Sequence, residues 1–471
     1  PGHFRLCLQK NIKKKECMEG KMSRQGQLSL TEGPILKTLS QLALPIMASS
    51  FLGTAYNITD MAWIGVLGSK AVAGVGVGGM YVWLSQGLVS LARMGGQVHV
   101  AQCCGGGDRE GAANYAASAL QLTCVFGGLF ALVCLFFTDA LIAFFQLNDS
   151  VTYGYAKIYM QITCGLIIFS FLNLTLTGLF TAQGDSKTPF KANLAGLVTN
   201  MALDPLLIMG IGPFPRMEVA GAAVATVTAQ FLVMVVMLVS VFRSQGEKNV
   251  IKNAKIFQIA QGSYYASICR IGVPTALQGT IYCMISMVLT RMVSGFGAGA
   301  VATQRVGGQI ESISWNTADG FGAALNAFVG QNYGAKKHDR IRKGYGISLR
   351  ILILWGILVT ALFVLLPEPM ARLFFYEEDV ISIAVDYLVI IGIGEGFMCV
   401  ELMTVGALSG LGRTKLCSVI SILLTGSRIP LALLLTNIGL GLNGVWWALT
   451  ISSIVKGIVF YFTFKRVSGR L

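Results

Sequence analysis

Charged side chains are scarce in this sequence. Asp, Glu, Lys and Arg make up only 12% of the 471 residues, whereas 54% are hydrophobic. An ordinary soluble domain has roughly twice that charged share. A water-soluble fold of this composition would lack the polar side chains needed to cover its surface, so we expect the chain to lie in a bilayer.

Side chains that carry catalysis or bind metals are also few. Histidine occurs three times, at His3, His99 and His338, so no Ser/His/Asp or Cys/His constellation can be assembled. Most of the 11 cysteines stand singly in apolar runs, where Cys is a small apolar filler. The adjacent Cys103 and Cys104 lack the CxxC spacing of a zinc site. We therefore predict that the chain is not an enzyme and that it has no cofactor, no structural metal and no required disulfide.

Apolar runs of membrane-spanning length are what the sequence has in abundance. Each is about 20 residues or longer, which is enough to cross a bilayer as a helix. Twelve can be counted, near residues 41–67, 72–102, 114–138, 154–183, 191–212, 219–242, 266–292, 298–332, 345–366, 381–410, 416–437 and 443–464. The predicted fold class is an all-α membrane protein with twelve transmembrane helices.

The net charge of +14 comes from basic residues that are clustered in a few segments of the chain. Basic residues gather in the N-terminal tail, in the loops at 243–255, 336–343 and 413–415, and in the tail at 465–470. If the even-numbered loops are cytoplasmic, about 25 Lys and Arg lie inside and about 4 outside, as the positive-inside rule requires. We therefore predict a multi-pass protein of the inner (plasma) membrane with both termini cytoplasmic, a monomer that binds no nucleic acid.

The sequence contains an internal repeat. The segment ALPIMASSF aligns with VPTALQGTI through Pro45 and Pro274, which are 229 residues apart. The same offset pairs Gly68 with Gly297, Ala71 with Ala300, Gln102 with Gln331 and Gly105 with Gly334, and a weaker match joins Gly184 and Lys187 to Gly412 and Lys415. Six spans in each half make the repeats parallel, related by an axis along the membrane normal. Two pseudo-symmetric six-helix lobes around a central cavity are typical of a transporter.

The repeat also divides the chain. We predict a polar basic cytoplasmic tail at 1–37, an N-lobe at 38–242, a cytoplasmic linker at 243–265, a C-lobe at 266–464 and a cytoplasmic tail at 465–471. Residues 1–21 lack the apolar stretch of a signal peptide. For them we expect either disorder or an over-extended gene prediction, with Met18 or Met22 as the start.

Charged residues inside the spans are the best guide to function, because each costs about 2.5 to 3.5 kcal/mol at the bilayer centre on insertion scales. The candidates are Asp60, Arg93, Asp204, Arg291, Arg305, Glu311, Asp319, Glu395, Glu401 and Arg428, with His99. Arg93 and Glu311 would line a cavity, pair with one another or merely hold helices together. Asp319, Arg305 and Arg428 receive no role.

Asp60 and Asp204 predict an oxygen-rich site in the N-lobe. Asn200 and Asp204 are four residues apart, so their side chains lie on one helix face, and Asn193 falls on that face too. Asp60 has Asn57 nearby in the first span. Carboxylate and amide oxygens suit H+ or Na+. The alternative is that each Asp only bonds a neighbouring helix. At the repeat-equivalent positions the second half has Leu289 and about Ile429, so the acids are confined to one lobe.

Taken together, these features resemble the multidrug and toxic compound extrusion (MATE) family over about residues 30–465. The resemblance rests on the two parallel halves, the LPIM entry with Pro45, the VLG and AVAG segments, the signatures at Gln102 and Gln331, and GAAVAT at 221–226. The chain looks like the DinF-like branch. The branch's cation-coupling site maps onto Asp60, Asn200, Asp204, Thr226 and Tyr159, with Pro45 as the point where the first span bends. Tyr282 stands where the NorM-like branch has a glutamate, so that C-lobe site is absent.

The resemblance implies an antiporter that exports amphipathic, often cationic organic compounds by alternating access, coupled to H+ or Na+. Drugs and membrane lipids would be its partners, and Asn57 and Asn193 would line its cavity with Arg93 and Glu311. The alternative is a lipid-linked precursor flippase of the same superfamily. Such a protein needs a strongly cationic cavity, to which Arg93, Arg305 and Arg428 could contribute.

Overall fold

Helices account for all the regular secondary structure that the computed structural model describes, over residues 29–145, 149–243, 249–375 and 377–470. The expectations for residues 1–21 concern a part of the chain outside these ranges. The helices are α2 (Ile35–Val66), α3 (Ser69–Gly106), α4 (Arg109–Phe136), α5 (Thr138–Ala143), α6 (Ser150–Gly165), α7 (Ile168–Ala182), α8 (Lys187–Met209), α9 (Glu218–Arg243), α10 (Gly262–Ser294), α11 (Ala298–Gly334), α12 (His338–Leu365), α13 (Pro367–Arg372), α14 (Glu378–Gly410), α15 (Thr414–Gly426), α16 (Arg428–Leu435), the π-helical η1 (Thr436–Leu440) and α17 (Gly441–Ser468).

The twelve predicted spans can all be found among these helices. Nine segments of the described chain are long and apolar enough to cross a membrane, or ten if α6 and α7, which meet at a 45° bend, form one span. One of the nine, Thr414–Ser468, is interrupted by Gly439 and Gly441, so it supplies two spans. The twelfth is α11, which is 37 residues long and carries Arg305, Glu311 and Asp319.

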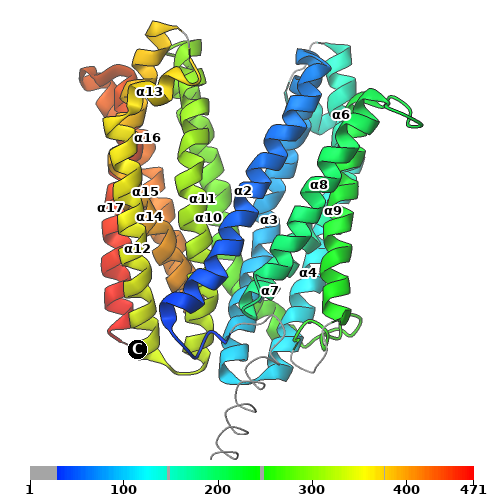
Figure 1. Ribbon diagram of the computed structural model, residues 1–471, viewed down its shortest axis with the longest axis vertical. Helices are drawn as coiled ribbons and strands as arrows, with labels where there is room; N and C mark the ends of the chain where they lie inside the picture. The colour runs from blue at the N-terminus through cyan, green and yellow to red at the C-terminus, as the bar shows by residue number, and fades with distance from the viewer. Residues whose placement is uncertain (1–28, 146–148, 244–248, 376, 471) are drawn as a thin grey trace, which may run out of the picture.

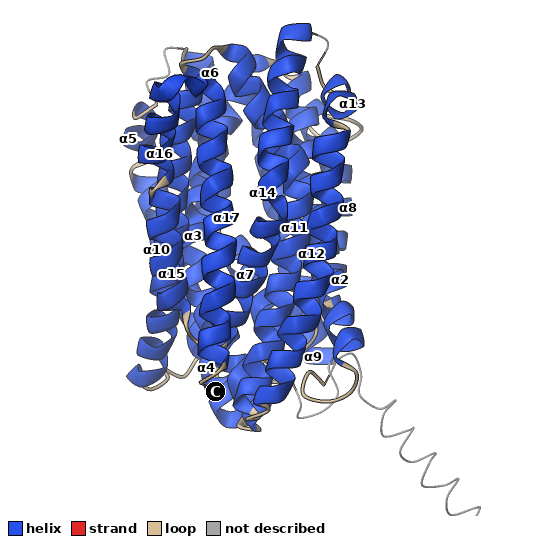
Figure 2. Ribbon diagram, turned by 90° about the vertical axis from the view of Figure 1, so that its left-hand side faces the viewer, coloured by secondary structure: helices blue, strands red, loops and turns tan. Residues whose placement is uncertain are grey.

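The helices form two bundles (Figure 1). Helices α2–α9, drawn from blue to green, make the N-lobe, and α10–α17, drawn from green to red, make the C-lobe. The bundles lean apart toward the end that carries α13 and converge at the end that carries the C-terminus. Seen from the side, the long helices run along one common direction (Figure 2).

Backbone geometry confirms the internal repeat. Gly68, between α2 and α3, has a φ of 102°, and its repeat partner Gly297, between α10 and α11, has a φ of 107°. Residues other than glycine rarely adopt this backbone conformation. Gly184 and Gly412, paired by the weaker match, also share a positive φ of 85° and 76°. The same turns therefore recur in both halves.

The interface between the lobes follows the same symmetry. α3 packs against both α10 and α11, and α2 packs against α11. Because the repeat relates α2 to α10 and α3 to α11, the contacts α2–α11 and α10–α3 are equivalent. On the symmetry axis, Gln97 Nε2 donates to Asn326 Oδ1 at 3.3 Å, and these two residues are themselves repeat partners, 229 positions apart.

Two glutamines bridge the lobes where they converge. Gln102 Nε2 donates to the carbonyl oxygen of Gly410 at the end of α14, at 3.0 Å. Its repeat partner Gln331 donates to the carbonyl oxygen of Ala182 at the end of α7, at 2.7 Å. Each lobe thus binds a helix end of the other, and we call Gln102 and Gln331 the reciprocal glutamine pair.

The linker between the lobes packs on the N-lobe. Val250 and Ile251 are buried in a core cluster formed with α3, α4, α7, α8 and α9. The Val250 amide donates to Gln183 Oε1 at 3.0 Å. Gln121 on α4 donates to the carbonyl oxygens of Ile256 and Gln258 at 2.7 and 2.8 Å. These bonds hold the described part of the linker against α4 and the end of α7, before α10 begins at Gly262.

Candidate functional site

Helices of the N-lobe bring three of the five predicted cation-coupling residues to one cavity of about 360 Å³. Asp60 comes from α2, Tyr159 from α6 and Thr226 from α9. The predicted cavity residues Asn57 and Asn193 line it as well. Side chains separated by up to 169 positions in the sequence therefore share one pocket.

Asn200 and Asp204 form the fully buried part of this region. Both side chains have no exposed surface, and Asn200 Nδ2 donates to Asp204 Oδ1 at 3.1 Å. This is the one-turn contact that their spacing predicts. α8 packs along α2, and the carboxyl groups of Asp204 and Asp60 interact electrostatically. Two acids from different helices thus lie in one region, with Asp204 fully buried and Asp60 at the cavity wall.

Several buried oxygens in this region lack a hydrogen-bond partner. Among the described residues they include Asp60 Oδ1, Asp204 Oδ2, Asn200 Oδ1, Thr226 Oγ1 and the Tyr56 hydroxyl. Burying such groups without a partner is unfavourable. A proton or a hard cation would satisfy carboxylate, amide and hydroxyl oxygens together. The chemistry of the donor set therefore fits the coupling ion that the sequence predicts.

Tyr56 was not among the predicted site residues. It lies on α2 four residues before Asp60 and lines the same cavity. The i, i+4 spacing that drew attention to Asn200 and Asp204 also places Tyr56 on the face of Asp60. That spacing is the sequence signal that could have identified it.

The two helices that carry Asp60 and Asp204 each contain a proline. Pro45 lies inside α2, and Pro205 directly follows Asp204 inside α8.

In the part of the chain that the structure describes, no group of three or more His, Cys, Asp and Glu could hold a metal ion. A cation bound between Asp60 and Asp204 would thus depend on amide and hydroxyl oxygens for its remaining ligands.

Arg93 and Glu311 lie in different surroundings. Glu311 lines a second cavity, in the C-lobe, and accepts a hydrogen bond from the Tyr387 hydroxyl at 3.5 Å. Arg93 packs its methylene groups near Gly178 and interacts electrostatically with Asp319 on α11. The ion pairs of the described residues do not join Arg93 to Glu311.

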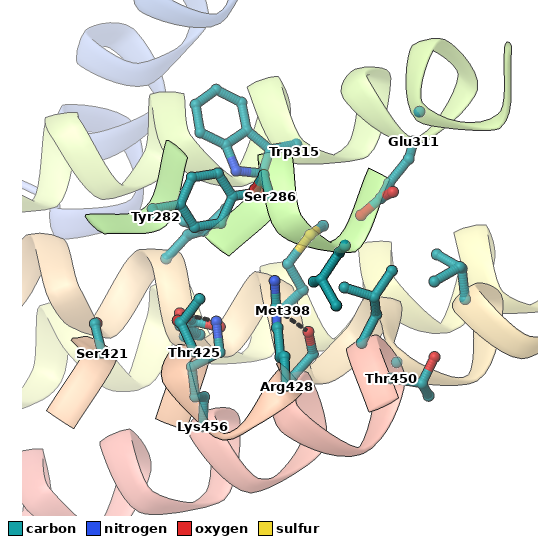
Figure 3. A pocket seen from close by; sticks show the side chains of 18 of the residues that line it. Tyr282, Ser286, Glu311, Trp315, Met398, Ser421, Thr425, Arg428, Thr450 and Lys456 are labelled. Carbon is teal, nitrogen blue, oxygen red and sulfur yellow. Dashed lines mark hydrogen bonds and ion pairs between the residues drawn. The ribbon is translucent and has the colours of Figure 1, made fainter. Parts of the chain in front are cut away.

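The C-lobe cavity is about 420 Å³ in volume and is strongly charged (Figure 3). Its charged residues come from α11, α14, α16 and α17, and they are Glu311, Glu395, Glu401, Arg428 and Lys456. Leu289, the repeat equivalent of Asp60, lines it without charge. The repeat position of Asp60 is therefore apolar in the C-lobe, as the sequence shows, and the charges of the C-lobe cavity stand at other positions.

Lys456 was missed in the sequence. Its Nζ lies 2.8 Å from Glu401 Oε1, and both side chains are nearly inaccessible to solvent. It is a single lysine within the apolar run at 443–464. A lone charge in a transmembrane helix is itself a signal, because it must find a partner inside the bundle.

Comparison with known proteins gives a consistent result. The MatE family profile matches residues 45–206 and 274–434, one match in each half. A probable multidrug resistance protein NorM of Thermotoga maritima is 28% identical over 447 residues, covering 92% of this chain and 91% of that protein. A FAD transporter of Shewanella oneidensis is 24% identical, with 94% and 97% covered. The crystal structure of a MATE protein in a bent conformation matches with a TM-score of 0.86 at 22% identity, with 93% and 97% covered.

Proposed function

We propose, from the premise that this chain belongs to the MatE family of multidrug and toxic compound extrusion transporters, that it is a cation-coupled antiporter exporting amphipathic, often cationic organic compounds. Membership of the family makes it a multi-pass membrane transporter of the drug-exporting class, and not an enzyme. The observation that carries the coupling is the set of unpartnered buried oxygens around Asp60 and Asp204.

In this proposal H+ or Na+ binds between Asp60 and Asp204 and changes the bend of α2 at Pro45. Ion binding would lower the affinity for drug, and the lobes would then exchange which side they open to. If both termini are cytoplasmic, the described arrangement is closed at the cytoplasmic end, where the reciprocal glutamine pair lies. A charge that crosses the membrane gains about 2.3 kcal/mol per 100 mV, which is ample to drive export.

We assign the chain to the DinF-like branch. The carboxylates with unpartnered buried oxygens on α2 and α8 support this assignment. So does Tyr282, which stands where the NorM-like branch has a glutamate. Because one relative is named a FAD transporter, FAD is the second candidate substrate, and it belongs in the transport assay as a competitor.

The test is ethidium transport by the purified protein reconstituted in liposomes, under an imposed pH gradient and then an imposed Na+ gradient. The wild type should transport the dye under one gradient, and Asp204→Asn should lose that dependence. Asp139→Asn is the matched control, because Asp139 is an exposed acid paired with Lys157 outside the cavity. Full gradient-driven transport by Asp204→Asn at equal protein content would refute the coupling site.

A further inference from the structure

Arg428 is a buried cation without an acidic partner at ion-pair distance among the described residues. It begins α16 and is 7% exposed. Its Nε donates to Ser452 Oγ at 3.1 Å and its Nη2 to Ser453 Oγ at 3.2 Å. The ion pairs found among the described residues do not include it. A buried charge balanced only by hydroxyl groups is unfavourable, and a guanidinium fixed in this way is ready to receive an anion.

The second cation of the cavity is already neutralised. Lys456 forms the buried ion pair with Glu401 at 2.8 Å. An incoming anion would therefore compete with a carboxylate at Lys456 but not at Arg428. This difference identifies Arg428 as the anion-binding position.

The same cavity also carries two acids outside the described ion pairs, Glu395 and Glu311. Glu395 is 1% exposed, and its Oε2 has no partner among the described residues. Glu311 receives the long hydrogen bond from Tyr387. Glu311 and Arg428 line the same cavity, and the ion pairs of the described residues do not join them, so the cavity presents an acid and a base that are not in direct contact. A compound with both charges would match this separation.

Aromatic and sulfur-containing side chains supply the rest of the wall. Tyr282 on α10, Trp315 on α11 and Met398 on α14 all line the cavity (Figure 3). Flat apolar surfaces of this kind bind aromatic rings, and Met adapts to varied shapes. The volume of about 420 Å³ is in the range of small-molecule sites.

We propose that the C-lobe cavity binds a zwitterionic aromatic compound, with its carboxylate or phosphate at Arg428, its amine at Glu311 and its rings against Tyr282 and Trp315. This inference rests on the proposed function, because it names a class of transported substrate. Ser452 and Ser453 are positioning residues that aim the guanidinium into the cavity.

The test compares two dyes that differ at one group. Rhodamine 110 has a free carboxylic acid, and rhodamine 123 is its methyl ester, which is a cation. Fluorescence anisotropy with the purified protein, without any ion gradient, gives both dissociation constants. The wild type should bind rhodamine 110 about tenfold more tightly, because only the carboxylate forms a charge-assisted pair with Arg428.

Arg428→Gln should weaken rhodamine 110 binding about tenfold and change rhodamine 123 binding less than about twofold. Arg291→Gln, on an exposed arginine of α10 outside the cavity, is the control and should bind both dyes as the wild type does. Equal weakening of both dyes by Arg428→Gln would assign Arg428 a structural role and overturn the proposal. Equal affinity of the wild type for the two dyes would also overturn it, even if Arg428→Gln does not fold.

The two proposals can fail separately. Asp204→Asn should keep the preference for rhodamine 110, because Asp204 lies in the other lobe. A protein that prefers rhodamine 110 but shows no gradient-dependent transport would overturn the coupling alone. Gradient-driven ethidium transport by a protein that does not discriminate between the rhodamines would overturn the C-lobe site alone.

Discussion

The Tyr56 hydroxyl and Thr226 Oγ1 are buried, line one cavity with Asp60 and interact with each other, yet neither makes a well-formed hydrogen bond among the described residues. Such atoms are rare in folded proteins and call for an explanation. A cation bound between Asp60 and Asp204 would supply it. Tyr56 then belongs to the coupling site, although it carries no charge at neutral pH.

Tyr56→Phe removes this hydroxyl while keeping the ring. If the hydroxyl helps to hold the ion, the ion concentration for half-maximal dye transport should rise about threefold to tenfold, since one hydrogen bond contributes about 0.5 to 1.5 kcal/mol. Transport at saturating ion should be retained. Tyr153→Phe removes an exposed hydroxyl that bonds Asp139 and is the control. An unchanged ion dependence in Tyr56→Phe would exclude Tyr56 from the site.

The ion pair of Lys456 and Glu401 predicts a stability effect. Lys456→Met leaves Glu401 buried without its partner, which should cost about 3 to 5 kcal/mol. The double variant Lys456→Met with Glu401→Gln should recover most of the loss, because no lone charge remains. Thermal unfolding in detergent measures this. Lys465→Met, at an exposed position of the same helix, should be neutral, and a double variant less stable than Lys456→Met would contradict the prediction.

At this scale the sequence was informative where the geometry is local. Asn200 and Asp204 meet because they are one turn apart on one helix, and spacing alone predicts that. The surroundings of Arg93 and Glu311 depend on how each helix is oriented about its own axis relative to its neighbours. The sequence of a single span does not reveal that orientation. Lys456 could have been noticed, but its partner Glu401 is 55 positions away on another helix.

At the scale of the helices, the crossing of α3 and α11 depends on glycine. A Cβ on Gly105 would lie 1.8 Å from the carbonyl oxygen of Gln331, and a Cβ on Gly334 would lie 1.9 Å from that of Gln102. Neither approach is compatible with a side chain. Small residues at such crossings let membrane helices come close together, and here they do so at repeat-equivalent positions.

Gly105→Ala should therefore push the lobes apart at the end where they converge. The measurement places spin labels at the exposed positions Arg109 on α4 and Lys343 on α12 in a cysteine-depleted protein. Pulsed electron paramagnetic resonance should then give a longer distance between the two labels. Gly79→Ala lies on the same helix with nothing within 4 Å of the added Cβ, and it should leave the distance unchanged. An identical distance distribution in both variants would contradict this role of the α3–α11 crossing.

The helices themselves were the most predictable level of the structure. Hydropathy and length place the twelve spans, and the repeat partners Gly68 and Gly297 mark matching turns. The break at Gly439 and Gly441 falls between the predicted spans 416–437 and 443–464. One feature escaped: the 45° bend between α6 and α7 falls in a continuous apolar run, so the local sequence does not mark it.

For the whole molecule, the reciprocal glutamine pair contributes two symmetry-equivalent hydrogen bonds between the lobes at the end where they converge. Gln102 and Gln331 each satisfy a carbonyl oxygen at the end of a helix in the opposite lobe. Helix ends leave such oxygens without partners inside the helix. Separating the lobes would therefore free two donors and two acceptors at once.

Gln102→Ala combined with Gln331→Ala should shift the balance toward separation of the lobes at this end. With about 1 kcal/mol for each bond, the ratio of the two states should change about 30-fold. The populations of short and long distances between labels at Arg109 and Lys343 measure it. Gln309→Ala, on an exposed glutamine of α11, is the control, and unchanged populations in the double variant would rule out a part for the pair in closure.

The contact between Gln97 and Asn326 carries a consequence for the origin of the chain. Residues on a two-fold axis face their own counterparts, so the group placed there must be able to bind a copy of itself. A carboxylate or an ammonium cannot, because like charges repel, whereas a primary amide carries both a donor and an acceptor. A single six-helix half with an amide at this position would therefore be self-complementary. The fused chain keeps, in one hydrogen bond, the chemistry by which two identical halves could once have associated.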